Sequence, residues 1–139
     1  MKVYIDSCIV IYLTDPGSPL HAQTSRAMIT LAQQGDTLLT SELVRLECRT
    51  HPLKHGDLEL LAELDHFFSR SIQSWCPFER PVFNLATELR ARQGLKTPDA
   101  LHLAAALHMN CDAFWTNDER LQRAAGEQLR LITTGALQD

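Results

Sequence analysis

Several features that mark whole classes of protein are scarce in this sequence of 139 residues. Aromatic residues make up only 6%, there are six glycines and six prolines, and we find neither an internal repeat nor a low-complexity tract. With 45% hydrophobic and 22% charged residues, the composition excludes a collagen-like chain, a coiled coil and a disordered acidic segment. Chains of this length commonly form one domain with a full core. We therefore expect a single globular domain over residues 1–139.

Long apolar runs are also missing, and we expect no targeting segment. No run approaches the roughly 18 apolar residues that a membrane helix needs. The apolar stretch over residues 3–13 is interrupted by Asp6 and lacks a small-residue cleavage site. We expect a cytoplasmic protein with no membrane partner.

The cysteines do not form a recognisable site. Cys8, Cys48, Cys76 and Cys111 lie far apart and include no C-x-x-C pair, which argues against a zinc knuckle and a thioredoxin motif. Two disulfides remain arithmetically possible. We expect reduced, buried thiols.

An excess of basic residues is missing as well. Lys and Arg total 13 and Asp and Glu total 17, so the net charge is −4 at pH 7. This is the wrong sign for a protein that holds nucleic acid through a broadly basic surface. The positions of the acids therefore matter more than their number.

Short β-branched or aromatic runs alternate with stretches of helical spacing. We predict strands at residues 3–5, 37–39, 72–75, 113–115 and 131–132, and helices at residues 22–32, 43–48, 58–68 and 79–93 and from residue 97 onward. The second of these helices is expected to end before Pro52. Strands separated by helices need crossover connections, so we predict a three-layer α/β/α fold with a mainly parallel sheet of four to five strands.

Four acidic residues lie near the ends of these elements. Asp6 follows the first strand and Asp118 follows the fourth, so both are expected at the sheet edge where ligands bind in such folds. Asp99 lies just inside a helix, where exposed N–H groups favour the ionised carboxylate. Glu47 falls beside the apolar face of its helix and needs a partner there.

Carboxylates that converge at one edge raise each other's pKa values unless a cation lies between them. The economical explanation is one or two hard divalent cations, Mg²⁺ or Mn²⁺, which prefer oxygen ligands. Such ions can activate water for attack on a phosphodiester. Without these four acids, acidic and basic residues would balance at 13 each, so the net charge does not exclude an RNA substrate.

Each acid also has a structural interpretation. Asp99 could be a residue that only favours its helix start, and Asp118 could only cap the helix that follows it. Glu47 could be a salt-bridged surface residue, and Glu42 could be the second acid in its place. Asp6 is the hardest to explain as structure, because it breaks an otherwise apolar run.

The sequence resembles a PIN-domain ribonuclease over most of its length. The resemblance rests on four segments: residues 3–13 with Asp6 and Ser7, residues 40–47 ending in Glu47, residues 97–106 with Asp99 and His102, and residues 115–118 ending in Asp118. The length of the chain resembles that of the VapC toxins of toxin–antitoxin pairs. Cys8 departs from the family, because many relatives have a polar residue there.

The resemblance implies a magnesium- or manganese-dependent endoribonuclease with a sheet of order 3-2-1-4-5. Asp6, Glu47, Asp99 and Asp118 would then be the catalytic and metal-binding residues, and the hydroxyls of Ser7 and Thr116 would orient carboxylates or water. The family also implies a homodimer and a small antitoxin whose C-terminal segment covers the active site.

Histidines and basic residues are less informative. His102 shares a helix face with Asp99; we predict a packed, hydrogen-bonded side chain, with a ligand role as the alternative. His51 and His55 have metal-like spacing, but Pro52 favours a surface loop. Phosphate contacts are predicted for basic residues near the acids, with a solvated helix face as the alternative: Arg45, Arg49, Arg92 and Lys96.

Other functions fit less well. A receiver-like domain needs paired acids after its first strand and a late lysine, but Asp6 stands alone and no lysine follows Lys96. A haloacid-dehalogenase-like phosphatase needs an acid at the position of Cys8. Two alternatives stay open: a PIN-fold RNA-processing nuclease that is not a toxin, and a non-catalytic PIN-fold interaction module. The sequence does not identify the RNA target.

Overall fold

The computed structural model describes residues 1–126 and 129–132, which fold around a parallel sheet. The strands are β1 (Lys2–Ile5), β2 (Thr37–Ser41), β3 (Ser74–Cys76), β4 (Ala113–Trp115) and β5 (Arg130–Ile132). Their order is β3-β2-β1-β4-β5, and every neighbouring pair is parallel. The predicted fold class and strand order are confirmed.

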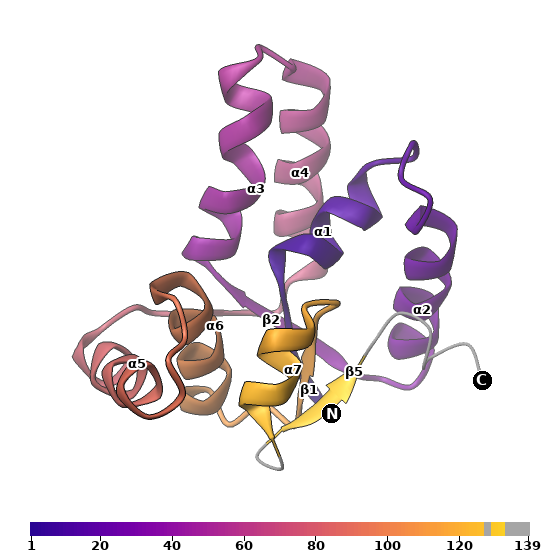
Figure 1. The fold of residues 1–139 in the computed structure, drawn as a ribbon. Helices are drawn as coiled ribbons and strands as arrows, with labels where there is room; N and C mark the ends of the chain where they lie inside the picture. The colour runs from indigo at the N-terminus through magenta and orange to yellow at the C-terminus, as the bar shows by residue number, and fades with distance from the viewer. Residues whose placement is uncertain (127–128, 133–139) are drawn as a thin grey trace.

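Helices connect all the strands and cover the sheet. They are α1 (Ser7–Thr14), α2 (His21–Gln33), α3 (Glu42–Lys54), α4 (Leu58–Ser71), α5 (Arg80–Gln93), α6 (Thr97–His108) and α7 (Glu119–Ala125). Right-handed crossovers place α1–α4 on one face of the sheet and α5–α7 on the other. The packing agrees, because α1 contacts α2, α3 and α4, whereas α6 contacts α5 and α7. Figure 1 shows α3 and α4 as a pair that stands away from the sheet.

The core lies on both sides of the two central strands, β1 and β4. Residues 3–5 and 113–115 are all completely buried, as expected for parallel strands covered on both faces. Tyr4 and Phe114 stack across this pair with ring centroids 5.3 Å apart. The alanines of α6, Ala100 and residues 104–106, have no exposed surface, and their small side chains let the helix pack closely on the sheet.

Helix α1 was not predicted. Its residues 9–11 are Ile, Val and Ile, which favour strands over helices. Asp6 overrides this preference: its carboxylate Oδ1 accepts a hydrogen bond from the Ser7 N–H at 2.7 Å and caps the helix. Ile9 and Val10 are then buried against the core, so packing decides the conformation.

The predicted end of α3 before Pro52 is wrong. The helix continues to Lys54, and the N–H of His55 still donates to the carbonyl of His51 at 3.1 Å. A proline in the last turn removes only one N–H donor, and burial of the Pro52 ring offsets that loss. His51 and His55 therefore lie at the helix end, with ring centroids 4.3 Å apart, and not in a surface loop.

The predicted burial of the thiols is confirmed for three of the four cysteines. All four are free; Cys48, Cys76 and Cys111 are buried and Cys8 is half-buried. Burial raises the pKa of the Cys76 and Cys111 thiols to about 11, so both stay neutral at physiological pH. Within residues 1–126 and 129–132, no helix is both long and apolar enough to cross a membrane.

Phe114 should be the more costly of two phenylalanines to truncate. Phe114→Ala removes a completely buried ring that stacks on Tyr4 and should lower the free energy of unfolding by about 3–5 kcal/mol. Phe83→Ala is the matched control, because Phe83 is 48% exposed, and it should cost under about 1 kcal/mol. Urea unfolding measures both; equal losses would contradict the central position of β4 in the core.

Candidate active site

Asp6 lies at the junction of β1, β4 and α1. Its N–H donates to the carbonyl of Trp115 at 3.1 Å, which extends the β1–β4 ladder by one residue. The side chain is only 7% exposed, and its two oxygens have different partners. Oδ1 accepts from the Ser7 N–H at 2.7 Å, and Oδ2 accepts from the Thr116 hydroxyl at 2.7 Å. These donors fix the orientation of the buried carboxylate.

Glu47 and His102 approach the same carboxylate from two helices. Glu47 Oε1 lies 2.6 Å from His102 Nε2, and that nitrogen lies 3.9 Å from Asp6 Oδ1. One ligand atom from each of the three residues falls within 4.8 Å of the others, a spacing that could hold a metal ion. His102 is 2% exposed and bonded through both nitrogens, which confirms the predicted packed histidine.

Glu42, the alternative second acid, lies elsewhere. Its side chain is 73% exposed and pairs with Arg45 at 3.7 Å. Glu42 is the first residue of α3, whereas Glu47 lies five residues further along and about 140° round the helix. The helix therefore presents Glu47, and not Glu42, to Asp6.

Asp118 caps α7 and is tied to Asp6 through Thr116. Its Oδ1 accepts from the Arg120 N–H at 2.9 Å, so the structural interpretation of Asp118 as a cap holds. Its own N–H donates to Thr116 Oγ1 at 3.0 Å. Since the same hydroxyl donates to Asp6, Thr116 fixes the spacing of the two acids.

Asp99 lies in the first turn of α6, three residues before His102. Partial burial raises the pKa of Asp99, and the carboxylate of Asp118 raises it further. Asp6 also raises this pKa, whereas Arg120 lowers it. The helix start was expected to favour the ionised form, but burial and neighbouring acids outweigh it. Asp99 thus shares the electrostatic environment of Asp6 and Asp118.

The hydroxyls of Ser7 and Thr116, both predicted to orient carboxylates or water, have different contacts in the structure. Thr116 is completely buried and bonded to Asp6 at 2.7 Å. The Ser7 hydroxyl is 3.5 Å from Asp6 Oδ1, at the limit of a hydrogen bond, and the Ser7 N–H makes the shorter contact. Cys8 Sγ also approaches, 3.7 Å from Asp6 Oδ2.

Two further polar residues beneath the site, Tyr4 and Ser41, were missed as parts of it. The Tyr4 hydroxyl lies 2.8 Å from Ser41 Oγ and 3.0 Å from His102 Nδ1. The signal was available for Tyr4, because residues two apart on a strand share a face and Asp6 is two residues further on. Ser41, which caps α3, lies in the segment 40–47 of the family resemblance but was not predicted as part of the site.

The four predicted phosphate contacts fall into two groups. Arg45 and Arg49 both face α4, where Asp65 Oδ1 lies 3.9 Å and 2.9 Å from their guanidinium groups. Each arginine is two residues from Glu47, which at about 100° per residue places it on nearly the opposite side of the helix. Arg92 and Lys96 are exposed, and Lys96 directly precedes α6, so Lys96 is near Asp99 along the chain.

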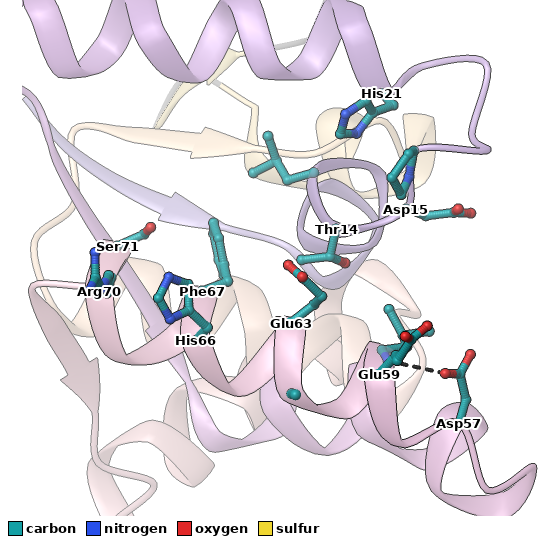
Figure 2. A pocket seen from close by; sticks show the side chains of 14 residues that line it. Thr14, Asp15, His21, Asp57, Glu59, Glu63, His66, Phe67, Arg70 and Ser71 are labelled. Carbon is teal, nitrogen blue, oxygen red and sulfur yellow. Dashed lines mark hydrogen bonds between the residues drawn. The ribbon is translucent and has the colours of Figure 1, made fainter.

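A cavity of about 830 Å³ lies away from these acids. It is lined by the end of α1, the loop that follows, the start of α2, and α4 with the residue before it. Figure 2 shows Thr14, Asp15 and His21 on one side and Glu59, Glu63 and His66 on the other. None of the four acids lines this cavity, so the acid cluster and the cavity are separate features.

The acid cluster has the donor chemistry of a hard-cation site. Its carboxylates come from the end of β1, from α3, from the start of α6 and from the residue before α7. Burial is the main cause of the raised pKa of Asp99, and the carboxylates of Asp118 and Asp6 add a repulsion that a bound cation would relieve. The residues present therefore fit a divalent cation that prefers oxygen ligands.

Comparisons with known proteins agree with this description. Solved structures with the same fold include VapBC2 from Rickettsia felis bound to a promoter DNA fragment, with a TM-score of 0.76, 20% identity and coverage of 96% of this chain and 98% of that one. VapC20 from Mycobacterium tuberculosis, a sarcin–ricin loop cleaving toxin, has a TM-score of 0.70, 16% identity and coverage of 92% and 98%. VapBC-1 from Haemophilus influenzae has a TM-score of 0.66, 14% identity and coverage of 97% and 99%.

At sequence identities of 14–20%, the similarity to these structures shows that the fold is shared. A search of curated proteins finds no match for the sequence. The family model of the PIN domain matches residues 3–127, a span that includes Asp6, Glu47, Asp99 and Asp118. The chain therefore belongs to the PIN domain family.

Proposed function

We propose that this PIN-domain protein is a Mg²⁺- or Mn²⁺-dependent endoribonuclease and the toxin of a toxin–antitoxin pair. The observation that carries the proposal is the approach of Asp6 and Glu47 to within metal-binding distance of each other. Asp118 is bonded to Asp6 through Thr116, and Asp99 is near enough for Asp118 and Asp6 to raise its pKa. Membership of the PIN domain family supports it, and so does the fold shared with toxins such as VapC20.

The four carboxylates would hold the cation, and the chain orients them from within. Thr116 and the Ser7 N–H hold the oxygens of Asp6, and His102 holds Glu47. A divalent cation bound there would activate water and neutralise charge in an in-line displacement at phosphorus. Asp118 is held by its bonds to Thr116 and Arg120, so the chain's own contribution is to keep the acids in place.

RNA would be attracted locally, because the chain as a whole has a net charge of −4. The exposed Lys96, three residues before Asp99, is the best placed of the predicted phosphate contacts. Arg92 is exposed in the last turn of α5. Arg45 and Arg49 form ion pairs with Asp65. They could bind RNA phosphates only if these ion pairs broke.

A small antitoxin is the partner that the toxin assignment requires. Two of the similar structures, from Rickettsia felis and Haemophilus influenzae, are VapBC assemblies. We propose that a cognate antitoxin silences the protein by covering its acid cluster, and that the protein is a cytoplasmic homodimer of single-domain chains. A nuclease that processes RNA without being a toxin would share the site and lack this partner.

Cleavage of RNA should require the acids and a divalent cation. Asp6→Asn or Glu47→Gln should lower the cleavage rate at least about 100-fold, since each removes a charged cation ligand. Glu42→Gln is the matched control on the same helix, because Glu42 is 73% exposed and outside the cluster. Cleavage is followed on total RNA with EDTA, Mg²⁺ or Mn²⁺.

Full cleavage in EDTA, or equal rates for Glu47→Gln and Glu42→Gln, would contradict the proposed site. Absence of cleavage by the unaltered protein under every metal condition would favour the non-catalytic interaction module.

Asp99→Asn should stabilise the metal-free protein at neutral pH. The pKa of Asp99 is raised in the folded state, so its ionised form opposes folding above that pKa. The opposition disappears as the pH falls below the ordinary value, where the carboxyl is protonated in both states. The melting temperature in EDTA should therefore rise at pH 7 and approach the unaltered value in acid.

Glu88→Gln is the control for this prediction, because it removes one negative charge from an exposed position on α5. A fall in melting temperature for Asp99→Asn at pH 7, or a gain equal to that of Glu88→Gln, would show that the pKa of Asp99 is not raised in the folded protein.

An adjacent reading frame should encode a small protein that suppresses the activity. Co-expression should restore growth and block RNA cleavage, because the partner would cover the acid cluster. Growth and RNA ends are measured after brief induction of the toxin alone, the pair, and an Asp6→Asn toxin. Unchanged toxicity and cleavage with the partner present would remove the toxin assignment and leave the nuclease assignment in place.

A further inference from the structure

A buried chain of hydrogen bonds runs from the start of α3 to the acid cluster. Ser41 Oγ lies 2.8 Å from the Tyr4 hydroxyl, which lies 3.0 Å from His102 Nδ1. His102 Nε2 then lies 2.6 Å from Glu47 Oε1. Ser41 and Tyr4 have no exposed surface and His102 has 2%, so these groups are shielded from water and each donor hydrogen needs a partner within the protein.

The partners determine the direction of the chain. A carboxylate has no hydrogen to donate, so the 2.6 Å contact requires a hydrogen on His102 Nε2. Nδ1 then accepts from the Tyr4 hydroxyl, whose oxygen accepts from the Ser41 hydroxyl. Ser41 Oγ in turn accepts the N–H of Val44 at 3.4 Å.

The opposite direction leaves a group unsatisfied. With a hydrogen on Nδ1, the Tyr4 hydroxyl would donate to Ser41. The Ser41 hydroxyl would then have no acceptor among the described residues, because its other contact is the Val44 N–H. A buried donor without an acceptor costs about 1–3 kcal/mol, which favours the first arrangement.

We propose that Tyr4 fixes His102 in the Nε2–H form, which makes His102 a positioning residue for Glu47 and excludes it from the cation's ligands. His102 is placed as a third ligand candidate beside Asp6 and Glu47. A nitrogen that carries a hydrogen has no lone pair for a metal, so the imidazole contributes a hydrogen bond and the ligands stay carboxylate oxygens.

This arrangement has a consequence for the choice of metal. Imidazole nitrogen suits Zn²⁺ and related ions, whereas carboxylate oxygen suits Mg²⁺ and Mn²⁺. By holding Nε2 protonated, Tyr4 would bias the site toward the hard cations. The metal preference rests on the proposed function, whereas the form of His102 is a property of the metal-free protein.

The first test is the form of His102 in the metal-free protein. Long-range ¹H–¹⁵N correlation spectra distinguish a protonated ring nitrogen from an unprotonated one. We expect the His102 Nε2 to carry the hydrogen and Nδ1 to be unprotonated; His102→Gln identifies the signals by their loss. The Nδ1–H form would overturn the proposal, whatever the outcome of any metal or cleavage measurement.

The second test compares variants of the chain of hydrogen bonds. Tyr4→Phe removes only the hydroxyl and keeps the ring that stacks on Phe114. It should weaken Mn²⁺ binding about 10-fold, in the range found for groups that orient metal ligands, and should strengthen Zn²⁺ binding relative to Mn²⁺. Thr24→Val is the matched control: its buried hydroxyl donates to the carbonyl of Leu20 in another part of the fold.

A pair of substitutions at His102 separates positioning from packing. His102→Gln can still donate a hydrogen bond to Glu47 and should keep Mn²⁺ affinity within about 3-fold, whereas His102→Phe cannot donate and should lose about 10-fold or more. Calorimetry measures the affinities, and thermal unfolding confirms that each variant is folded.

Equal Mn²⁺ affinity for His102→Phe, Tyr4→Phe and the unaltered protein would overturn the positioning role. If the unaltered protein binds no Mn²⁺, the proposed cofactor fails instead, and the spectra of the metal-free protein still decide the form of His102.

Discussion

The carboxylate of Asp6, buried where β1 meets α1, is the group on which the rest of the site depends. A buried charge is costly unless hydrogen bonds and neighbouring groups compensate for it. Here the compensation comes from separate parts of the chain: the Ser7 N–H begins α1, and the Thr116 hydroxyl follows β4. The same bonds that stabilise the carboxylate thus bring β1, α1 and the β4–α7 connection together.

Thr116 also holds a second acid, Asp118, and His102 holds a third, Glu47. Thr116 accepts the N–H of Asp118, while His102 lies between Asp6 and Glu47. Asp99 has less compensation: burial and the neighbouring acids raise its pKa, and the positive charge of Arg120 does not offset them. Hydrogen bonds therefore hold the acids of the cluster in place but do not cancel the repulsion between Asp99 and its neighbouring carboxylates. This arrangement suits a divalent cation.

Several structural features were predictable because local signals and burial agree. Residues 3–5 and 113–115 are short apolar runs, and both lie in central strands that are buried on two faces. The prediction failed where packing overrode local preference. The β-branched residues of α1 are helical because Asp6 caps them and the core buries them, and Pro52 is tolerated because it lies in the last turn of α3.

The sequence by itself determined the alternation of strands and helices, the acids at their ends and the family to which the chain belongs. These follow from short-range patterns, since each depends on a few neighbouring residues. Only the tertiary structure decided which acid of α3 faces Asp6, that Arg45 and Arg49 pair with Asp65, and that Tyr4, Ser41 and His102 form one hydrogen-bonded chain. Each of these joins residues from different helices or strands, and such contacts exist only after the crossovers have placed those elements side by side.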